Sequence, residues 1–332
     1  MRVPMLVSAI IALCAVVVAS PAPVEAQAPL TKITFLTNYT FHGRHSPFFV
    51  GLDKGYYKAA GFDIDIQPAT GSGFVITAVD SGKADYGMAE AASVVQAEAK
   101  GAKVKSFMVF TDISTSGLAS LKPYKTLESL EGQRIAASQT DSARVILPIL
   151  LERAKIDPST IKWLAADPGV YSSLLLSGQT DLFTASLDGD VPALEKIAKP
   201  QHKTVYFTPF ADWGYDVFGY FLIAKDTTLA SDPAAAKRFA EATRKAVDYS
   251  VAHPEETARI MVKHNPALNY DTTLAQWRQT IKSIETPYVK KHGYGVATDD
   301  RLQRTVDLVK TAMKLEASLG PKDIYTSVLQ GH

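Results

Sequence analysis

The sequence contains a single cysteine, Cys14, which lies within an apolar run near the N-terminus. Once residues 1–26 are removed as a leader, the remaining chain has no cysteine. Disulfides, thiolate metal sites and a cysteine nucleophile are then excluded together. The stability of the mature protein must come from its packed core.

The chain also has no excess of either charge, since 35 basic and 34 acidic residues give a formal net charge of +1. This balance does not favour nucleic acid or an anionic membrane as a partner. The sequence has no G-x-S-x-G, H-E-x-x-H or P-loop lysine motif. We therefore expect that the protein is not an enzyme and binds no cofactor. The alternative is a secreted hydrolase whose serine, histidine and aspartate come together only in the folded chain.

One apolar run, at residues 5–19, follows Arg2 and precedes a small-residue cleavage site at residues 24–26. This pattern is typical of a secretory signal peptide, and the run is shorter than the roughly 20 apolar residues that a membrane span needs. Leu13 stands where a lipoprotein signal would have a small residue. We therefore expect cleavage of residues 1–26 and a periplasmic protein without a lipid anchor.

An internal repeat organises the rest of the chain. The stretch SGKADYGMAE at residues 81–90 returns as SGQTDLFTAS at residues 177–186. Each copy ends an apolar helical run and opens a short strand, which indicates two similar α/β units. Alternating strand and helix patterns predict two mainly parallel sheets flanked by helices, with a ligand cleft between the lobes.

The periodicity places the elements of each unit. Predicted strands are residues 33–36, 62–67, 84–88 and 104–110, then 134–137, 161–165, 182–185 and 205–207; predicted helices are 46–60, 73–81 and 93–100, then 143–154, 170–177 and 191–198. Extended stretches at 116–122 and 217–224 would cross between the lobes. Lobe 1 is therefore assigned residues 27–118 and 220–332, with C-terminal bracing helices, and lobe 2 residues 119–219.

Ligands of parallel α/β sheets bind beyond the carboxyl ends of the strands, where loops and helix N-termini converge. The loops after the predicted strands therefore carry the candidate ligand-binding residues. They are Asn38, Tyr39, Phe41, His42, His45, Gly71, Ser72, Gly73 and Glu90 in lobe 1, with Ser138, Thr140, Asp141, Ser142, Asp188, Trp213 and Tyr215 in lobe 2.

Some of these assignments have structural alternatives. The glycines of residues 71–73 could form only a tight turn, and Glu90 or Asp141 could serve only as a helix N-cap. His42 and His45 have the spacing of metal ligands. A zinc site would need a third ligand, and because the sequence identifies none, no metal is predicted.

Four segments carry a family resemblance: HSPFF at 45–49, KGYYK at 54–58, GFD at 61–63 and SGKADYG at 81–87. They resemble the sulfonate-binding and thiamine-precursor-binding group of ABC-importer solute-binding proteins. The resemblance implies a two-lobed, type II-like periplasmic-binding-protein fold. It also implies a monomeric receptor that closes on a small-molecule solute and delivers it to a membrane permease and ATPase.

The same family includes the pyrimidine synthase of thiamine biosynthesis, which consumes its own histidine and holds pyridoxal phosphate on a lysine. The resemblance places those two residues at Ala89 and Ser93 of this chain. It places the synthase's cysteine cluster near residues 215–219, where this chain has no cysteine. These departures predict a receptor that is not an enzyme.

The charges of the loops favour a ligand that donates hydrogen bonds. The loops offer the carboxylates of Glu90, Asp141, Asp188 and Asp190 against two close cations, Arg44 and Arg144. Tyr39 and Trp213 could stack on a flat ring, and the resemblance to pyrimidine binders implies that Asn38 and Tyr39 contact the ligand. We therefore expect a pyrimidine-like thiamine precursor or a related aromatic, with sulfonates, taurine or nitrate as the alternative.

Overall fold

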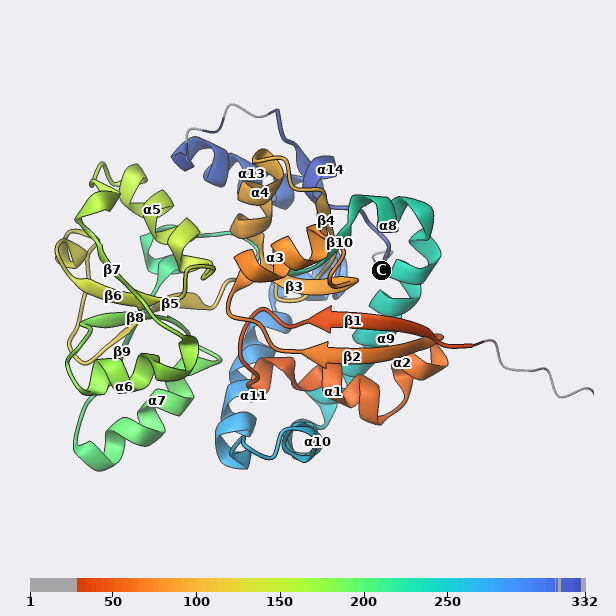
Figure 1. Ribbon diagram of the computed structural model, residues 1–332, viewed down its shortest axis with the longest axis horizontal. Coiled ribbons are helices and arrows are strands. Elements are labelled where there is room, and N and C mark those ends of the chain that lie inside the picture. Colours follow the sequence, from red (N-terminus) through yellow and green to blue (C-terminus); the bar gives the residue numbers. More distant parts are fainter. Residues whose placement is uncertain (1–28, 314, 316–317, 330–332) are drawn as a thin grey trace, which may run out of the picture.

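The computed structural model describes residues 29–313, 315 and 318–329, which form two lobes (Figure 1). The predicted leader, residues 1–26, lies outside the described residues. The first sheet has the order β2-β1-β3-β10-β4 and the second β7-β6-β8-β5-β9. The strands are β1 (Thr31–Leu36), β2 (Phe62–Gln67), β3 (Tyr86–Glu90), β4 (Val104–Val109), β5 (Ser116–Ser120), β6 (Arg134–Ala137), β7 (Lys162–Ala165), β8 (Leu182–Ser186), β9 (Tyr206–Pro209) and β10 (Tyr220–Lys225).

Each sheet has one antiparallel strand, which the chain reaches by crossing from the other lobe. β10 pairs antiparallel with both β3 and β4, and β5 pairs antiparallel with both β8 and β9. The remaining pairs, β1 with β2 and β3, and β6 with β7 and β8, are parallel. The predicted fold class of two mainly parallel α/β sheets is thus confirmed. Because β5 belongs to the second sheet, residues 116–118 lie with lobe 2, ahead of the expected boundary.

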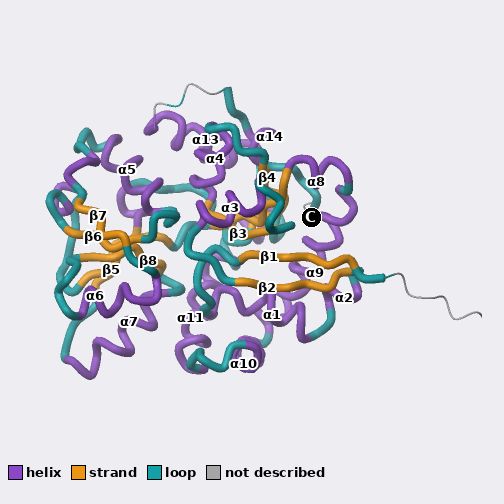
Figure 2. Tube along the Cα trace, in the orientation of Figure 1, coloured by secondary structure: helices purple, strands orange, loops and turns teal. Residues whose placement is uncertain are grey.

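Helices cover both faces of the two sheets (Figure 2). They are α1 (Ser46–Asp53), α2 (Tyr56–Ala59), α3 (Ser72–Asp80), α4 (Ala91–Ala99), α5 (Ala143–Arg153), α6 (Tyr171–Leu176), α7 (Asp190–Ala198), α8 (Asp226–Ser231), α9 (Pro233–Ala252), α10 (Pro254–His264), α11 (Tyr270–Ile284), α12 (Pro287–His292), α13 (Asp299–Met313) and α14 (Pro321–Ile324), with the short 3-10 turns η1 (Gly43–His45) and η6 (Phe210–Trp213). The single helix predicted at 46–60 is wrong. It breaks into α1 and α2 at Gly55, whose φ of +71° is the left-handed conformation that glycine adopts readily.

The aspartates of the repeated sequence fix the same contact in both lobes. Asp85, ahead of β3, accepts a hydrogen bond from the Thr34 backbone N–H at 2.8 Å. Asp181, ahead of β8, accepts one from the Arg134 backbone N–H at 3.0 Å and also pairs with the Arg134 guanidinium. Each aspartate thereby ties its strand to the neighbouring parallel strand. The repeat is a structural signature of the two sheets, and its aspartates lie outside the cleft lining.

The core of lobe 1 centres on Phe239 of α9, whose ring packs against the rings of Phe35, Tyr57 and Tyr86. A second apolar cluster lies on the other side of the sheet and includes residues of α3, α4 and α13. This cluster continues into α5 of lobe 2, since α13 contacts both α4 and α5. The C-terminal helices therefore pack on both lobes, whereas the sequence assigned them to lobe 1 alone.

Candidate functional site

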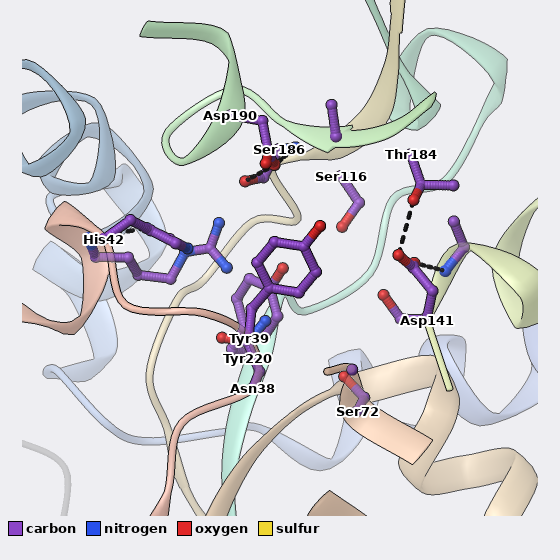
Figure 3. Close-up of a pocket in the computed structure, with 15 residues that line it drawn as sticks. Asn38, Tyr39, His42, Ser72, Ser116, Asp141, Thr184, Ser186, Asp190 and Tyr220 are labelled. Atoms are coloured by element: carbon purple, nitrogen blue, oxygen red, sulfur yellow. Dashed lines mark hydrogen bonds between the residues drawn. The ribbon is translucent and has the colours of Figure 1, made fainter. Parts of the chain in front are cut away.

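The residues that follow β1, β2, β6 and β8 line a cavity between the lobes, as expected for ligand sites of α/β sheets (Figure 3). Its volume is about 40 Å³, far below the roughly 150 Å³ of a cavity that binds benzene. A ring-sized solute therefore needs the lobes to separate or a lining side chain to move. The lining residues are Asn38, Tyr39, His42, Arg44, Gly71, Ser72, Ser116, Asp141, Ser142, Ala143, Thr184, Ala185, Ser186, Asp190 and Tyr220.

On one side of the cavity the lobes meet through backbone contacts. The Gly73 N–H donates to the Thr140 carbonyl at 3.0 Å, and the Ser138 hydroxyl donates to the Thr70 carbonyl at 2.5 Å. A Cβ atom at Gly71 would lie only 2.2 Å from the Thr140 oxygen, and the φ of Gly71 is +149°. Glycine is needed here because the opposite lobe approaches its backbone.

On the other side, Gln276 of α11 bridges the two lobes. Its Oε1 accepts a hydrogen bond from the Gly43 N–H at 2.8 Å, and its Nε2 donates to the Gly189 carbonyl at 2.5 Å. Gly43 belongs to lobe 1 and Gly189 follows β8 in lobe 2. The side-chain amide of Gln276 is therefore a clamp that forms only when the lobes are together.

A buried ion pair also crosses between the lobes. The Arg44 guanidinium donates to both carboxylate oxygens of Asp188, from Nε at 2.8 Å and from Nη2 at 2.5 Å. Hydroxyls of Thr115 and Thr280 complete the hydrogen bonding of Asp188, at 2.7 and 2.9 Å. The Tyr220 ring lies 4.2 Å from Arg44 Cζ. Despite burial, the paired guanidinium holds the pKa of Asp188 below its ordinary value.

Two other carboxylates line the cavity without a cation bonded to them. Asp141 accepts hydrogen bonds from the Thr184 hydroxyl at 2.7 Å and the Ala143 N–H at 2.9 Å. Asp190 accepts from the N–H and hydroxyl of Ser186, at 2.8 and 3.1 Å. Burial raises the pKa of Asp141, and it raises the pKa of Asp190 to about 6. Both groups would be stabilised by a ligand that donates hydrogen bonds or carries positive charge.

The two histidines of the first loop are neutral, because burial lowers the pKa of both. His45 Nδ1 accepts from the His42 N–H, so its Nε2 carries the proton and donates to Asn38 Oδ1 at 3.0 Å. His42 Nδ1 accepts from the Arg44 N–H at 3.4 Å, which leaves an Nε2–H donor on the ring that lines the cavity. His45 thus orients Asn38, and His42 supplies a donor.

Tyr39 stands in the middle of the residues that Figure 3 labels, with Tyr220 behind it. Its hydroxyl is buried beside Tyr171 and makes no well-formed hydrogen bond to the described residues. Burial raises the pKa of this hydroxyl well above its ordinary value, and the neighbouring Tyr171 contributes to the shift. A buried polar atom without a partner is costly. Tyr39 can therefore donate or accept a hydrogen bond when a solute enters.

The family can now be established from comparison with known proteins. Residues 42–257, more than half of the chain, match the family model described as NMT1/THI5 like. The chain belongs to this family. A relative from Candida albicans, 4-amino-5-hydroxymethyl-2-methylpyrimidine phosphate synthase, is 26% identical over 286 residues, which cover 81% of this chain and 84% of the relative.

Solved structures of low sequence identity share the fold of this NMT1/THI5-like chain. The alkanesulfonate-binding protein SsuA from Xanthomonas axonopodis, bound to MOPS, superposes with a TM-score of 0.67 at 13% identity, covering 90% of this chain and 99% of its own. A ligand-binding component of an ABC-type import system from Staphylococcus aureus, with zinc bound, has a TM-score of 0.64 at 12% identity, covering 90% and 97%. The predicted periplasmic-binding-protein fold is thereby confirmed.

The prediction that this chain is not an enzyme is contradicted. The relative from Candida albicans is named as an enzyme, and so is one from Saccharomyces cerevisiae that is 26% identical over 281 residues. The prediction relied on Ala89, Ser93 and the absence of cysteine, and those positions do not decide whether the chain is an enzyme.

The Ser93 hydroxyl is buried without a partner among the described residues and lines a groove of about 730 Å³ beside the cavity.

The structure brings seven of the sequence-predicted residues to the cavity of the NMT1/THI5-like chain: Asn38, Tyr39, His42, Gly71, Ser72, Asp141 and Ser142. Others lie around it. Gly73 and Thr140 line the neighbouring groove, and Phe41 lines a third groove beside α7 and α11. Ser138 joins the lobes. His45 is hydrogen-bonded to Asn38, and Asp188 is hydrogen-bonded to Arg44. Trp213 packs on Phe210 in η6 and does not line the cavity.

Glu90 is also outside the lining, although its strand ends at the cleft. Its Oε1 accepts hydrogen bonds from the Ser114 hydroxyl at 2.8 Å and the Tyr215 hydroxyl at 3.3 Å, while Oε2 has no partner among the described residues. Glu90 stands at the N-cap position of α4, but its side chain makes no capping hydrogen bond, so the structure does not support the alternative of a helix cap. Burial raises the pKa of Glu90 to about 8.

Several lining residues were missed. Asp190, the first residue of α7, was counted among the carboxylates but not selected as a ligand contact, and Ser186 is the last residue of β8. Ser116 and Tyr220 come from the crossing strands, and no sequence signal marks them because their role depends on strand register. Among the described residues, no group of three His, Cys, Asp or Glu side chains could hold a metal ion. No helix within those residues is long and apolar enough to span a membrane.

Proposed function

We propose that the cleft binds a small heteroaromatic solute of the aminopyrimidine type, and that the protein acts as the extracytoplasmic receptor of an ABC importer. The observation that carries the ligand class is the charge of the lining. Arg44 is already neutralised by Asp188, whereas Asp141 and Asp190 have no bonded cation. A ring that carries amino and hydroxyl donors matches these acceptors.

The raised pKa values of the two aspartates support this assignment. Burial disfavours their charged forms, and the charge of Asp141 adds to this effect at Asp190. The groups that bond them are neutral hydroxyls and backbone N–H groups. A protonated or donor-rich solute would favour the ionised form of both aspartates and would gain charge-assisted hydrogen bonds with them. A sulfonate or nitrate would instead face two carboxylates and an arginine that already has a partner.

The aromatic residues of the cavity suit a flat solute. Tyr39 and Tyr220 contribute rings to the lining, and a stacked ring contributes about 1 kcal/mol beyond burial. The His42 Nε2–H and the Tyr39 hydroxyl supply donors that could meet ring nitrogens. Because the closed cavity has only about 40 Å³, capture requires opening of the lobes and closure on the solute.

A receptor role is supported by the fold, by the clamp residues between the lobes, and by the leader that the sequence predicts. A ligand favours the closed state when both lobes contact it. Here the acceptors Asp141 and Asp190 belong to lobe 2, whereas Tyr39 and His42 belong to lobe 1. Micromolar affinity, about 8 kcal/mol of binding free energy, is sufficient for capture.

Calorimetry with 4-amino-5-hydroxymethyl-2-methylpyrimidine, taurine, methanesulfonate and nitrate tests the ligand class. We expect the pyrimidine to bind with micromolar affinity and the three sulfonic or nitrate solutes to give no heat. Binding of the sulfonates or nitrate with no response to the pyrimidine would refute the proposal. Native mass spectrometry of protein purified from periplasmic extracts would identify a carried-over solute directly.

A further inference from the structure

Arg44 is the one Lys or Arg side chain among the described residues that line the cavity. It is 1% exposed, and it comes from η1 in lobe 1. Its partner Asp188 is fully buried and comes from the loop after β8 in lobe 2. The charge of Arg44 is therefore neutralised by a carboxylate of the opposite lobe.

The fork of Arg44 is occupied in the way that a bound oxyanion would occupy it. Two N–H groups on one edge of the guanidinium, Nε and Nη2, meet the two oxygens of one carboxylate at 2.8 and 2.5 Å. This bidentate geometry is the one that arginine uses for planar oxyanions. The hydroxyls of Thr115 and Thr280 hold the carboxylate in that position.

Among the described residues, no second carboxylate is hydrogen-bonded to Arg44, and the nearby Arg144 is not open to an anion. The Arg144 guanidinium donates to the carbonyls of Ser138 and Ala137 and lies over the Trp163 ring, so it is not available to a solute. Asp190 is held by Ser186. Without Asp188, Arg44 would be a buried charge with no bonded counter-ion, which is strongly unfavourable.

We propose that Asp188 determines the charge class of the solute. Its carboxylate occupies Arg44 from across the cleft and so excludes small oxyanions. When the Asp188 carboxylate is removed, the cleft binds a small oxyanion at Arg44. Asp188 acts through Arg44 and need not touch the solute. The inference deepens the proposed function, because it rests on the view that this cleft selects donors over anions.

The test is the variant Asp188→Ala, which removes the carboxylate from Arg44, with acetate as the small-oxyanion probe. Purified variant and wild type are titrated with sodium acetate in a calorimeter, and their thermal melting is followed in acetate and in chloride at equal ionic strength. We expect the variant to bind acetate at least tenfold more tightly than the wild type. We also expect acetate to raise its melting temperature above that in chloride, with no such difference in the wild type.

The double variant Arg44→Gln/Asp188→Ala is the matched control, because it has the same space but no guanidinium. Its response to acetate should equal its response to chloride. If Asp188→Ala gains no acetate binding, or if the double variant gains it equally, the proposal is wrong. A merely structural role of Asp188 would lower stability in both salts alike.

Asp188→Ala could fail to fold in chloride, since it leaves Arg44 unpaired. In that case folding restored by acetate would support the proposal, and Asp188→Ser, which removes the carboxylate but keeps a neutral hydrogen-bonding group, is titrated as a second variant with the same expectation. Failure of both variants to fold even in acetate would contradict the proposal. Wild-type binding of methanesulfonate would refute the proposed function itself, whereas pyrimidine binding without an acetate gain in the variants would refute only this inference.

Discussion

The acidic side chains of the cleft fall into three chemical states. Asp188 is paired with a guanidinium, Asp190 and Asp141 are held by neutral donors, and Glu90 has one oxygen with no partner among the described residues. Their pKa values follow this order of partners: below the ordinary value for Asp188, raised for the two held by neutral donors, and raised to about 8 for Glu90.

Replacement of Asp190 by Asn should weaken binding of the pyrimidine probe. A charge-assisted hydrogen bond contributes about 1.5–3 kcal/mol, so the dissociation constant should rise roughly tenfold or more. Titration calorimetry measures this. Asp63→Asn is the matched control, because Asp63 is exposed on β2 and lies outside the cavity lining. Equal affinity of Asp190→Asn and the wild type would remove this carboxylate from the ligand contacts.

Glu90 should make the stability of the protein fall as pH rises. Its pKa is about 8 in the folded protein against an ordinary value of 4.5, so the folded state binds the proton more tightly. The free energy of unfolding therefore declines between those two pH values, by up to about 1.4 kcal/mol per pH unit for this single group.

The variant Glu90→Gln isolates this contribution, since it keeps the shape of the side chain and does not titrate. We expect its stability relative to wild type to increase by about 3 kcal/mol from pH 5.5 to pH 8. Urea denaturation at a series of pH values measures the difference. A difference that stays constant with pH would show that Glu90 does not titrate in this window.

The sequence identified the lining residues that follow predicted strands, such as Asn38, Tyr39 and Asp141. The rule that ligands bind beyond strand ends is sufficient for those. It could not identify Tyr220, which lies opposite Glu90 on an antiparallel strand. It also selected Glu90, whose side chain turns away to the Ser114 and Tyr215 hydroxyls, because pattern alone does not show side-chain direction.

At the scale of elements, alternation of apolar residues located most strands and helices to within a few residues, including β2 at Phe62–Gln67. Patterning could not show that β10 would insert between β3 and β4, because that placement depends on contacts between distant segments. The break at Gly55 was also missed. Helical periodicity continues across it, and only the positive φ separates α1 from α2.

The repeated aspartates should contribute to stability and not to binding. Asp85→Ala removes the hydrogen bond from the Thr34 N–H that joins β3 to β1, so we expect a loss of about 1–2 kcal/mol in the free energy of unfolding. Chemical denaturation measures the loss, with Asp63→Ala as the exposed control. Affinity for the pyrimidine should be unchanged. A variant of normal stability but reduced affinity would mean that the repeat serves the site instead.

At the scale of the whole molecule, side chains hold the two crossing segments in place. Asp112, in the first crossing segment, is held by the Arg301 guanidinium of α13 and the Thr286 hydroxyl. In the second crossing segment, the Tyr220 N–H donates a hydrogen bond to the Thr111 hydroxyl, and the Gly219 N–H donates one to the Thr111 carbonyl. These contacts lie on the side where the chain crosses between the sheets. We expect the lobes to open by releasing the contacts that Gln276 and the residue 71–73 loop make between them.

Gln276 should shift the balance between open and closed lobes. The variant Gln276→Leu keeps most of the side-chain volume but loses the hydrogen bonds to Gly43 and Gly189, which together join the lobes. Loss of about 1 kcal/mol from the closed state should weaken pyrimidine binding roughly fivefold and increase the radius of gyration of the solute-free protein in small-angle X-ray scattering. Gln201→Leu, on the exposed surface of lobe 2, should change neither quantity. A variant that binds and scatters like the wild type would show that this clamp does not control closure.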